Sequence, residues 1–408
     1  MTSGAYASGV PKFALISHVL PPFGFGQGVV LQRLLEGFAP DGYCLLSKND
    51  YRPPRIDADG EQSDLALRGL PVQFYFVGQR WRRVGTGPGL LRSVVRTTGA
   101  PLRVARIFQV LREERPRVLV VCSGDLVDLP AGFIAARVAG IPLLAYMFDD
   151  YRNQHYRPVE REAAGVLERM SLRGARSVVV PNEFAADAYT ARYGLTPRIV
   201  RNMVDAAHLA MAPQATWPRA AGEVHVVYTG GIYHAQTDSF ARLVDALTSW
   251  DRPERVTLHI YSAQTPAQIA AAGIPPGATL HQAVAAAEMP SVLRQADVLF
   301  LPLAFASGIP EVIRTSSPGK LGEYLASGAP ILAHAPRDSF LTWYLRKHNC
   351  GIVCDSPDVG ELRRAFALLV DDAELRSTVT TNAVACARRD FNAEDARASF
   401  AQALREAV

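Results

Sequence analysis

A short segment near residue 320 combines a positive charge, a carboxylate and a predicted helix start. Ser317, Pro318, Gly319 and Lys320 open a helical pattern, and Glu323 follows three residues later. Free N–H groups and the dipole at a helix start favour an anion such as a diphosphate, and Lys320 adds positive charge. A carboxylate one turn on can accept two hydrogen bonds from vicinal hydroxyls. The alternative is an exposed Lys–Glu pair, which contributes about 0.3 kcal/mol.

Gly230 and Gly231 follow a predicted strand in the second half of the chain. Glycine at such a turn lets the backbone approach a phosphate closely. The next residues, Ile232 to Gln236, carry no Arg or Lys. Any further charge for an anion at this turn therefore has to come from Lys320 or Arg314, with hydrogen bonds from Gln236 or His234.

A second glycine cluster lies near the N-terminus, where Gly24, Gly26 and Gly28 precede a predicted helix. Such a turn suits a phosphate at the helix start. A dinucleotide site is the competing interpretation, and Asp50 stands where a ribose-binding acid is expected. The third glycine is not at the usual offset, so this pattern supports the dinucleotide site only weakly.

Asp149 and Asp150 end another predicted strand. They suit the positioning of a substrate hydroxyl, or else the capping of the following segment. His18, at the end of the first predicted strand, is interpreted as a structural histidine with satisfied hydrogen bonds. Asn182 is expected to cap its helix.

The elements that must hold these residues alternate apolar runs with helical patterns, which predicts βαβ units and parallel sheets. Strands are expected at 12–20, 41–47, 72–77, 117–123, 142–148, 175–181, 224–230, 256–262, 297–303, 329–335 and 351–356. Helices are expected at 29–38, 132–139, 183–193, 238–249, 288–295, 319–327, 358–370, 372–388 and 393–406. The sequence thus predicts two Rossmann-like domains facing a cleft, with ligands beyond the carboxyl ends of the strands. The expected boundaries are 1–205, a linker at 206–223, 224–390, and a helix at 391–408 packing back on the first domain.

Composition excludes several classes of protein. The 408 residues are 49% hydrophobic and 20% charged, which excludes a mostly disordered chain. No apolar run is long enough for a membrane-spanning helix, and we expect no signal peptide. Five scattered cysteines fit buried thiols in a reducing compartment. Ten arginines between 80 and 117 predict either a solvated basic helix pair or a surface for anionic lipid or a phosphate-bearing acceptor; the stretch carries no nucleic-acid-binding motif.

The order of several segments resembles one known family. These segments are the glycine turn at 24–28, AGIPLLAYMFDD at 139–150, SVVVPNE at 177–183, RIVRNMVD at 198–205, VVYTGGIYHAQ at 226–236, PSVLRQADVLFLPL at 290–303 and SSPGKLGEYLASGAPIL at 316–332. The chain resembles the glycosyltransferases of the GT-B fold, of the retaining family 4 type, from about Lys12 to the C-terminus. The resemblance implies transfer of a sugar from a nucleotide donor held by the second domain. It implies no metal and no other cofactor.

The chain departs from the family pattern at three places. The family's first Glu of a spaced pair is replaced by Thr315, although Ser316 and the nearby Glu311 offer polar groups. The Arg and Lys expected after Gly231 are missing. Phe148 stands where the family often has a His, before Asp149. At these three places the roles of the family's residues are not carried over to this chain.

The resemblance then assigns the site residues. The predicted catalytic residues are Lys320, Asp149 and Asp150, and the predicted donor-binding residues are Gly26, Gly230, Gly231, Gln236, Thr315, Ser316, Ser317, Gly319, Lys320 and Glu323. No metal ligand is expected.

Three function classes remain open at this point: a retaining glycosyltransferase, a sugar-nucleotide 2-epimerase, and an inactive sugar-nucleotide-binding scaffold. The expected partners are a UDP- or GDP-sugar and a small-molecule, glycan or lipid-linked acceptor, without nucleic acid. We expect a cytoplasmic protein, with peripheral contact to an anionic membrane face as a further hypothesis.

Overall fold

The computed structural model describes residues 9–21, 26–51, 73–78, 89–204, 222–274, 277–285 and 287–408, with the backbone alone for 89–99. The chain divides into two compact units. Unit 1 is Met1–Arg201 with Glu394–Val408, and unit 2 is Asn202–Ala393. Most of the predicted linker at 206–223 lies outside the described residues, which resume at Gly222.

Unit 1 is built on a parallel sheet whose described strands run in the order β3-β2-β1-β4-β5-β6-β7. Its inner strands are apolar and buried, as expected for a parallel sheet with helices on both faces. The strands are β1 (Phe13–Ile16), β2 (Tyr43–Ser47), β3 (Gln73–Phe76), β4 (Val118–Cys122), β5 (Leu143–Tyr146), β6 (Ser177–Val180) and β7 (Arg198–Ile199).

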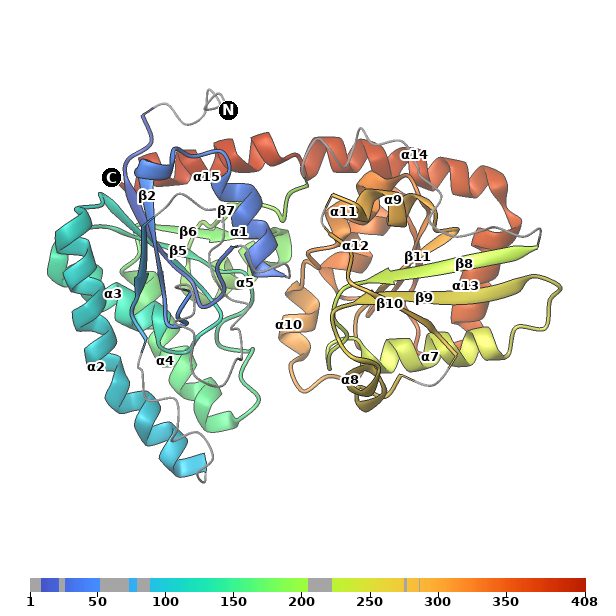
Figure 1. Ribbon diagram of the computed structural model, residues 1–408, viewed down its shortest axis with the longest axis horizontal. Coiled ribbons are helices and arrows are strands. Elements are labelled where there is room, and N and C mark those ends of the chain that lie inside the picture. The colour runs from blue at the N-terminus through green and yellow to red at the C-terminus, as the bar shows by residue number, and fades with distance from the viewer. Residues whose placement is uncertain are drawn as a thin grey trace, which may run out of the picture. The chain divides into compact units, whose positions relative to one another are not determined.

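Helices cover both faces of this sheet (Figure 1). One face carries α2, α3 and α4, whose Ile107, Leu129 and Leu172 belong to one buried cluster with Ile16. On the other face Phe400 of α15 packs edge-on against Phe13, at 5.9 Å between ring centroids. The helices of unit 1 are α1 (Gln27–Leu35), α2 (Gly89–Glu114), α3 (Asp128–Ala139), α4 (Pro158–Arg173), α5 (Glu183–Tyr193) and α15 (Ala393–Ala407).

Unit 2 repeats the architecture with a parallel sheet in the order β10-β9-β8-β11-β12-β13 over its described residues. The strands are β8 (Glu223–Thr229), β9 (Arg255–Ser262), β10 (Thr279–Gln282), β11 (Val298–Pro302), β12 (Ile331–His334) and β13 (Ile352–Cys354). In both sheets the chain order reverses beside the first strand of the unit, between β1 and β4 and between β8 and β11. Ligands of such sheets bind beyond the strand ends at that reversal.

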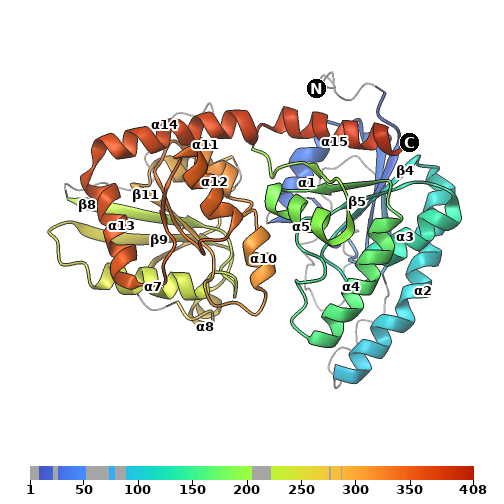
Figure 2. The ribbon, with the colours of Figure 1, turned by 180° about the vertical axis from the view of Figure 1, so that it is seen from behind.

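The helices of unit 2 also form two layers (Figure 2). On one face, Phe240 of α7 and Phe366 of α13 join a buried cluster with Phe300 of β11. On the other face α11 packs against α9 and α14. The helices are α7 (Thr237–Thr248), α8 (Pro266–Ala271), α9 (Met289–Arg294), α10 (Pro310–Thr315), α11 (Leu321–Ser327), α12 (Phe340–His348), α13 (Val359–Asp371) and α14 (Ala373–Asp390).

The predicted fold of two Rossmann-like α/β domains is confirmed. Each predicted strand is present, and β7 and β10 are short additional edge strands. In the basic segment, residues 89–114 form one continuous helix, α2, across Pro101, and the preceding residues 79–88 lie outside the described ranges. All five cysteines are buried and free. None of the helices in the described ranges is long and apolar enough to cross a membrane.

Candidate functional site

The reversal point of unit 2 is formed by the ends of β8 and β11. Gly230 follows β8 in a left-handed conformation, with φ of 102°, and its N–H donates to the Tyr261 carbonyl at 2.8 Å. Gln264 holds Ile232, two residues after Gly230, by accepting from its N–H at 2.6 Å and donating to its carbonyl at 3.0 Å. The turn is therefore fixed by hydrogen bonds, and at Gly230 only glycine fits without backbone strain.

Lys320 lies directly beside this turn. A Cβ at Gly230 would stand 3.3 Å from Lys320 Nζ. The ammonium donates to the Tyr228 hydroxyl at 2.7 Å and lies 4.1 Å from the centre of that ring. Within the part of unit 2 that the structure describes, no carboxylate is within ion-pairing distance of Lys320. Burial lowers the pKa of Lys320 to about 7, and the Glu323 carboxylate acts in the opposite direction.

Glu323 lies in the first turn of α11 and is half-buried. Lys320 is the residue that immediately precedes this helix. The structure therefore brings the predicted Lys320, Glu323, Gly230 and Gly231 into one region of unit 2. A cation beside a glycine turn, with a carboxylate less than one helical turn away, can hold an anion and adjacent hydroxyls together.

The segment before Lys320 is held by unit 2 itself. Thr315 ends α10, and its hydroxyl donates to the Glu311 carbonyl at 3.0 Å. The Ser317 carbonyl accepts from Asn202 Nδ2 at 2.8 Å. Ser317 Oγ and Asn202 Oδ1 are both buried without a hydrogen-bond partner in the described ranges. These two atoms are thus available to a bound molecule or water; Ser317 is among the predicted donor-binding residues, whereas no sequence motif indicated Asn202 for this role.

The remaining predicted donor residues differ in exposure. Gly319 is exposed, and nothing lies near the position of a Cβ there. Ser316 is half-buried in extended backbone after α10. Gln236 is buried, with Oε1 at 2.9 Å from the Tyr228 hydroxyl. Glu311 lies one turn before Thr315 on α10 and is exposed.

Tyr228 was missed by the sequence interpretation. It is fully buried in β8, and its hydroxyl lies 2.7 Å from the Gly231 carbonyl as well as contacting Lys320 and Gln236. Its position directly before the Thr229–Gly230 step was a usable signal, since the last residues of a strand at a reversal point face the ligand region.

Unit 1 has a corresponding reversal point at the ends of β1 and β4. His18 follows β1, and its carbonyl accepts from Asn49 Nδ2 at 2.6 Å and from the Tyr51 hydroxyl at 3.2 Å. A Cβ at Gly124 would stand 2.1 Å from His18 Cε1, and Gly124 has φ of 130°. His18 Nδ1 is buried without a hydrogen-bond partner among the residues described. The prediction that His18 is a satisfied structural histidine is therefore wrong.

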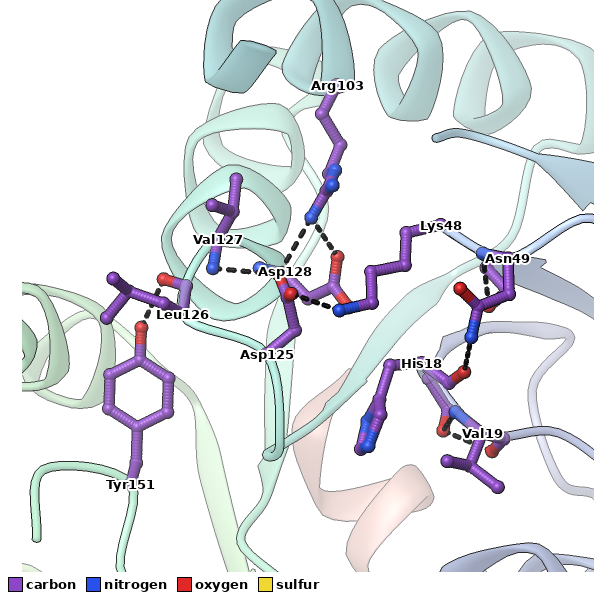
Figure 3. Close-up of polar contacts among 12 residues, drawn as sticks. His18, Val19, Lys48, Asn49, Arg103, Asp125, Leu126, Val127, Asp128 and Tyr151 are labelled. Atoms are coloured by element: carbon purple, nitrogen blue, oxygen red, sulfur yellow. Dashed lines mark hydrogen bonds and ion pairs between the residues drawn. The ribbon is translucent and has the colours of Figure 1, made fainter. Parts of the chain in front are cut away.

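An ion network stands beside His18 (Figure 3). Asp125 accepts from Lys48 at 2.5 Å and from Arg103 at 2.8 Å, and Arg103 also donates to Asp128 at 2.8 Å. Burial opposes the ionisation of Asp125, but Lys48 and Arg103 overcome it and hold its pKa far below the ordinary value. Burial and the charge of Asp125 raise the pKa of Asp128. Burial and the Lys48 charge lower the pKa of His18, so His18 is neutral near pH 7.

The predicted aspartates after β5 have unlike surroundings. Asp149 is exposed, and its N–H donates to Ser123 Oγ at 3.3 Å. Asp150 is buried, and both its oxygens accept hydrogen bonds from Arg192 and from Asn153. We therefore keep Asp149 as a candidate for substrate contact and interpret Asp150 as a residue that fixes the loop.

Gly26 immediately precedes α1 with φ of 53°, and a Cβ there would meet open space. Gly24 lies in the segment 22–25, outside the described residues. Phe148 stacks on Tyr146 at 4.2 Å between ring centroids. Across the described ranges, no group of three or more His, Cys, Asp or Glu is arranged to hold a metal ion.

Comparison with known proteins identifies a family for each unit. Residues 25–204 match the glycosyl transferase 4-like domain, and residues 223–372 match the glycosyl transferases group 1 family. No curated protein matches the sequence.

Solved structures share the fold at low identity. Sucrose-phosphate synthase from Thermosynechococcus elongatus is 15% identical with a TM-score of 0.66, over 96% of this chain and 98% of that one. Anabaena HepE in complex with UDP and glucose is 16% identical with a TM-score of 0.68, and the match covers 97% of this chain and 99% of that one. The lipopolysaccharide outer core galactosyltransferase WaaB is 13% identical with a TM-score of 0.61, and the match covers 97% of this chain and 100% of that one. With both units matched to the two halves of one family, the chain belongs to the group 1 glycosyltransferases of the GT-B fold.

Proposed function

We propose that the protein transfers a sugar from a nucleoside diphosphate sugar to an acceptor hydroxyl, with retention of anomeric configuration. The observation that carries this proposal is the Lys320 ammonium, which stands beside the Gly230 turn with Tyr228 as its hydrogen-bond partner. A cation placed there neutralises the diphosphate as it departs. Glu323 is proposed to accept hydrogen bonds from the ribose hydroxyls.

In the proposed reaction the bond between the anomeric carbon and the diphosphate breaks on the face where the acceptor oxygen bonds. The acceptor proton passes to the departing phosphate oxygen. The protein then supplies orientation and charge stabilisation rather than a strong base. Asp149 is the candidate for orienting the acceptor hydroxyl, and Thr315, Ser316, Ser317 and Gly319 are candidates for contact with the donor.

The donor proposal is supported by a related structure, because Anabaena HepE has been solved with UDP and with UDP-glucose. A thermal-shift panel of UDP, GDP, ADP and dTDP tests the donor and its base. A ligand that binds only the native state raises its unfolding temperature. No shift with any of the four would contradict the proposed donor site.

The site assignment predicts that Lys320→Ala and Glu323→Ala each reduce transfer about a hundredfold without unfolding the protein. Lys347→Ala is a matched control, since the Lys347 ammonium also lies over an aromatic ring, 4.4 Å from the centre of Trp343. Loss of donor consumption is measured together with circular dichroism. Wild-type turnover in both site variants would remove this assignment.

Retention, metal independence and membrane contact are separate proposals. NMR of the product anomer tests retention, and activity that survives EDTA supports metal independence.

The membrane proposal places the protein at the cytoplasmic face, where exposed arginines of the basic segment, such as Arg112, Arg115 and Arg117, contact anionic lipid. Arg103 is excluded from this surface because it pairs with Asp125 and Asp128. Equal co-sedimentation with neutral and anionic vesicles would contradict it.

A further inference from the structure

Tyr228 connects several parts of the proposed donor site. Its hydroxyl accepts from Lys320 Nζ at 2.7 Å. The same hydroxyl lies 2.7 Å from the Gly231 carbonyl and 2.9 Å from Gln236 Oε1. A phenol has one hydroxyl proton, so Tyr228 donates a hydrogen bond to one of these two oxygens. Its own hydroxyl oxygen accepts the hydrogen bond from the Lys320 ammonium. Tyr228 therefore links the glycine turn to Lys320.

The positive charge of Lys320 depends on Tyr228, because burial of the lysine disfavours its charged form. Burial lowers the pKa of Lys320 to about 7, with Glu323 opposing. The ring face of Tyr228, 4.1 Å from Nζ, and the phenol oxygen both favour a cation. The hydroxyl and ring together hold the lysine in the pose that points it at the turn.

Among the described residues of unit 2, Glu323 on α11 acts on the Lys320 charge, and Tyr324 on α11 and Tyr233 after β8 act on Tyr228; His234 directly follows Tyr233 in the chain. The Tyr324 hydroxyl accepts from Thr229 N–H at 3.0 Å, so its hydrogen bond holds the end of β8. Burial raises the pKa of the Tyr228 and Tyr324 phenols well above the usual value, and burial lowers that of His234. Near pH 7 both phenols are neutral.

We propose that Tyr228 is a positioning residue for the donor, because its hydroxyl and ring hold the Lys320 ammonium charged and aimed at the diphosphate position beside Gly230. This inference rests on the proposed function, since it concerns the same donor site. A bound diphosphate favours the protonated lysine. Donor binding is then coupled to proton uptake, and affinity falls as pH rises above the pKa that Lys320 has in the free protein.

The test measures donor affinity by calorimetry between about pH 6 and about pH 8.5, on the full chain. The probe is whichever of UDP-glucose, GDP-glucose, ADP-glucose and dTDP-glucose gives the largest thermal shift. A sugar nucleotide is used because its diphosphate is a diester, whereas a terminal phosphate titrates near pH 6. Binding of none of the four contradicts the proposed donor site itself.

Three variants separate the alternatives. We expect Tyr228→Phe to bind about tenfold more weakly than wild type near pH 8, with the loss shrinking toward pH 6, where the lysine is protonated in both. Tyr324→Phe is the matched control, since it removes a buried phenol hydroxyl that contacts Thr229 instead of Lys320. It is expected to keep the wild-type pH profile. Lys320→Arg keeps its charge throughout this range, so its profile is expected to be flat.

A Tyr228→Phe profile parallel to wild type at every pH would overturn the inference, even if the affinity fell, because it would indicate only a structural role. A pH-independent wild-type affinity would overturn it too, while leaving the donor site in place. Proton uptake by the wild type, measured in two buffers of different ionisation enthalpy, gives a readout that does not require Tyr228→Phe to fold. Zero uptake near pH 8 contradicts the inference.

Discussion

At the scale of single residues, the two adjacent glycines after β8 are unlike each other. Gly230 has φ of 102°, and a Cβ there would stand 3.3 Å from Lys320 Nζ. At Gly231 a Cβ would meet only Gln264 Oε1, at an ordinary 3.7 Å, and no positive φ is required. Glycine is therefore required at position 230 by both the backbone conformation and the nearby Lys320 side chain, whereas neither requirement applies at position 231.

We predict that Gly230→Ala weakens donor binding at least tenfold and lowers the free energy of unfolding by about 1 kcal/mol. The strain acts on the backbone, and the added methyl group displaces the ammonium. Gly231→Ala is the control and is expected to change the donor affinity by less than about threefold. Calorimetric titration and urea denaturation measure both. Equal effects of the two substitutions would contradict the role given to Gly230.

Gly124 sets the position of His18 in the same manner. An added Cβ would stand 2.1 Å from His18 Cε1, at a φ of 130°. Gly124→Ala is expected to cost about 3 kcal/mol of unfolding free energy, from clash and strain together. Gly140→Ala is the control, because Gly140 has φ of 70° with open space around it and is expected to cost about 1 kcal/mol. Similar costs for the two would show that the imidazole is not held against Gly124.

The sequence located Lys320, Glu323 and Gly230 because each follows a readable local signal, namely a helix start, a helical spacing and a strand end. Tyr228 and His18 also lie near strand ends, but that position alone does not show which groups their side chains contact. A tyrosine in an apolar strand is ordinary core composition, and its contact with Lys320 joins positions 92 residues apart. The unpartnered Nδ1 of His18 depends on how β1 and β4 pair, which composition alone does not specify.

At the scale of elements, long apolar runs were predicted well, and short or polar elements were not. β10 has mostly exposed residues, and α10 is a six-residue helix that begins at a proline. Both lack the period that identifies an amphipathic element. The omission of α10 matters because this helix places Thr315 and Glu311 one turn apart.

Three adjacent strands of the unit 2 sheet, β8, β9 and β10, carry a row of histidines. His225 Nδ1 lies 2.9 Å from His259 Nε2, and His259 Nδ1 lies 2.9 Å from His281 Nε2. Burial, followed by the charges of His281 and His225, lowers the pKa of His259 to about 4. Between pH 6.5 and pH 4 the unfolded chain therefore binds a proton at this position that the folded chain does not.

This difference predicts that unit 2 loses stability as pH falls, because protons bind preferentially to the unfolded state. His259→Gln removes the titrating ring and is expected to reduce the loss between pH 7 and pH 4 by about 3 kcal/mol. Urea denaturation at several pH values measures the slope. An unchanged slope in the variant would contradict the shifted pKa of His259.

At the scale of the whole molecule, the chain returns to its first unit after completing its second. Phe400 of α15 packs against Phe13, Phe38 and Tyr146, each at 5.9 Å between ring centroids. Arg397 Nε donates to the Arg33 carbonyl at 2.7 Å. The last helix is therefore part of the core of unit 1, although in sequence it directly follows α14 of unit 2.

Phe400→Ala tests whether α15 belongs to the core of unit 1. The substitution opens a cavity among aromatic rings and is expected to cost about 4 kcal/mol. That cost falls on unit 1, so hydrogen exchange followed by mass spectrometry should quicken in β1 and β5 and stay unchanged from β8 to β13. Phe366→Ala is the reciprocal control, because Phe366 packs 5.0 Å from Trp250 within unit 2 and should quicken exchange there. Faster exchange in unit 2 alone after Phe400→Ala would mean that α15 stabilises unit 2 instead, and the division of the chain into units would have to be redrawn.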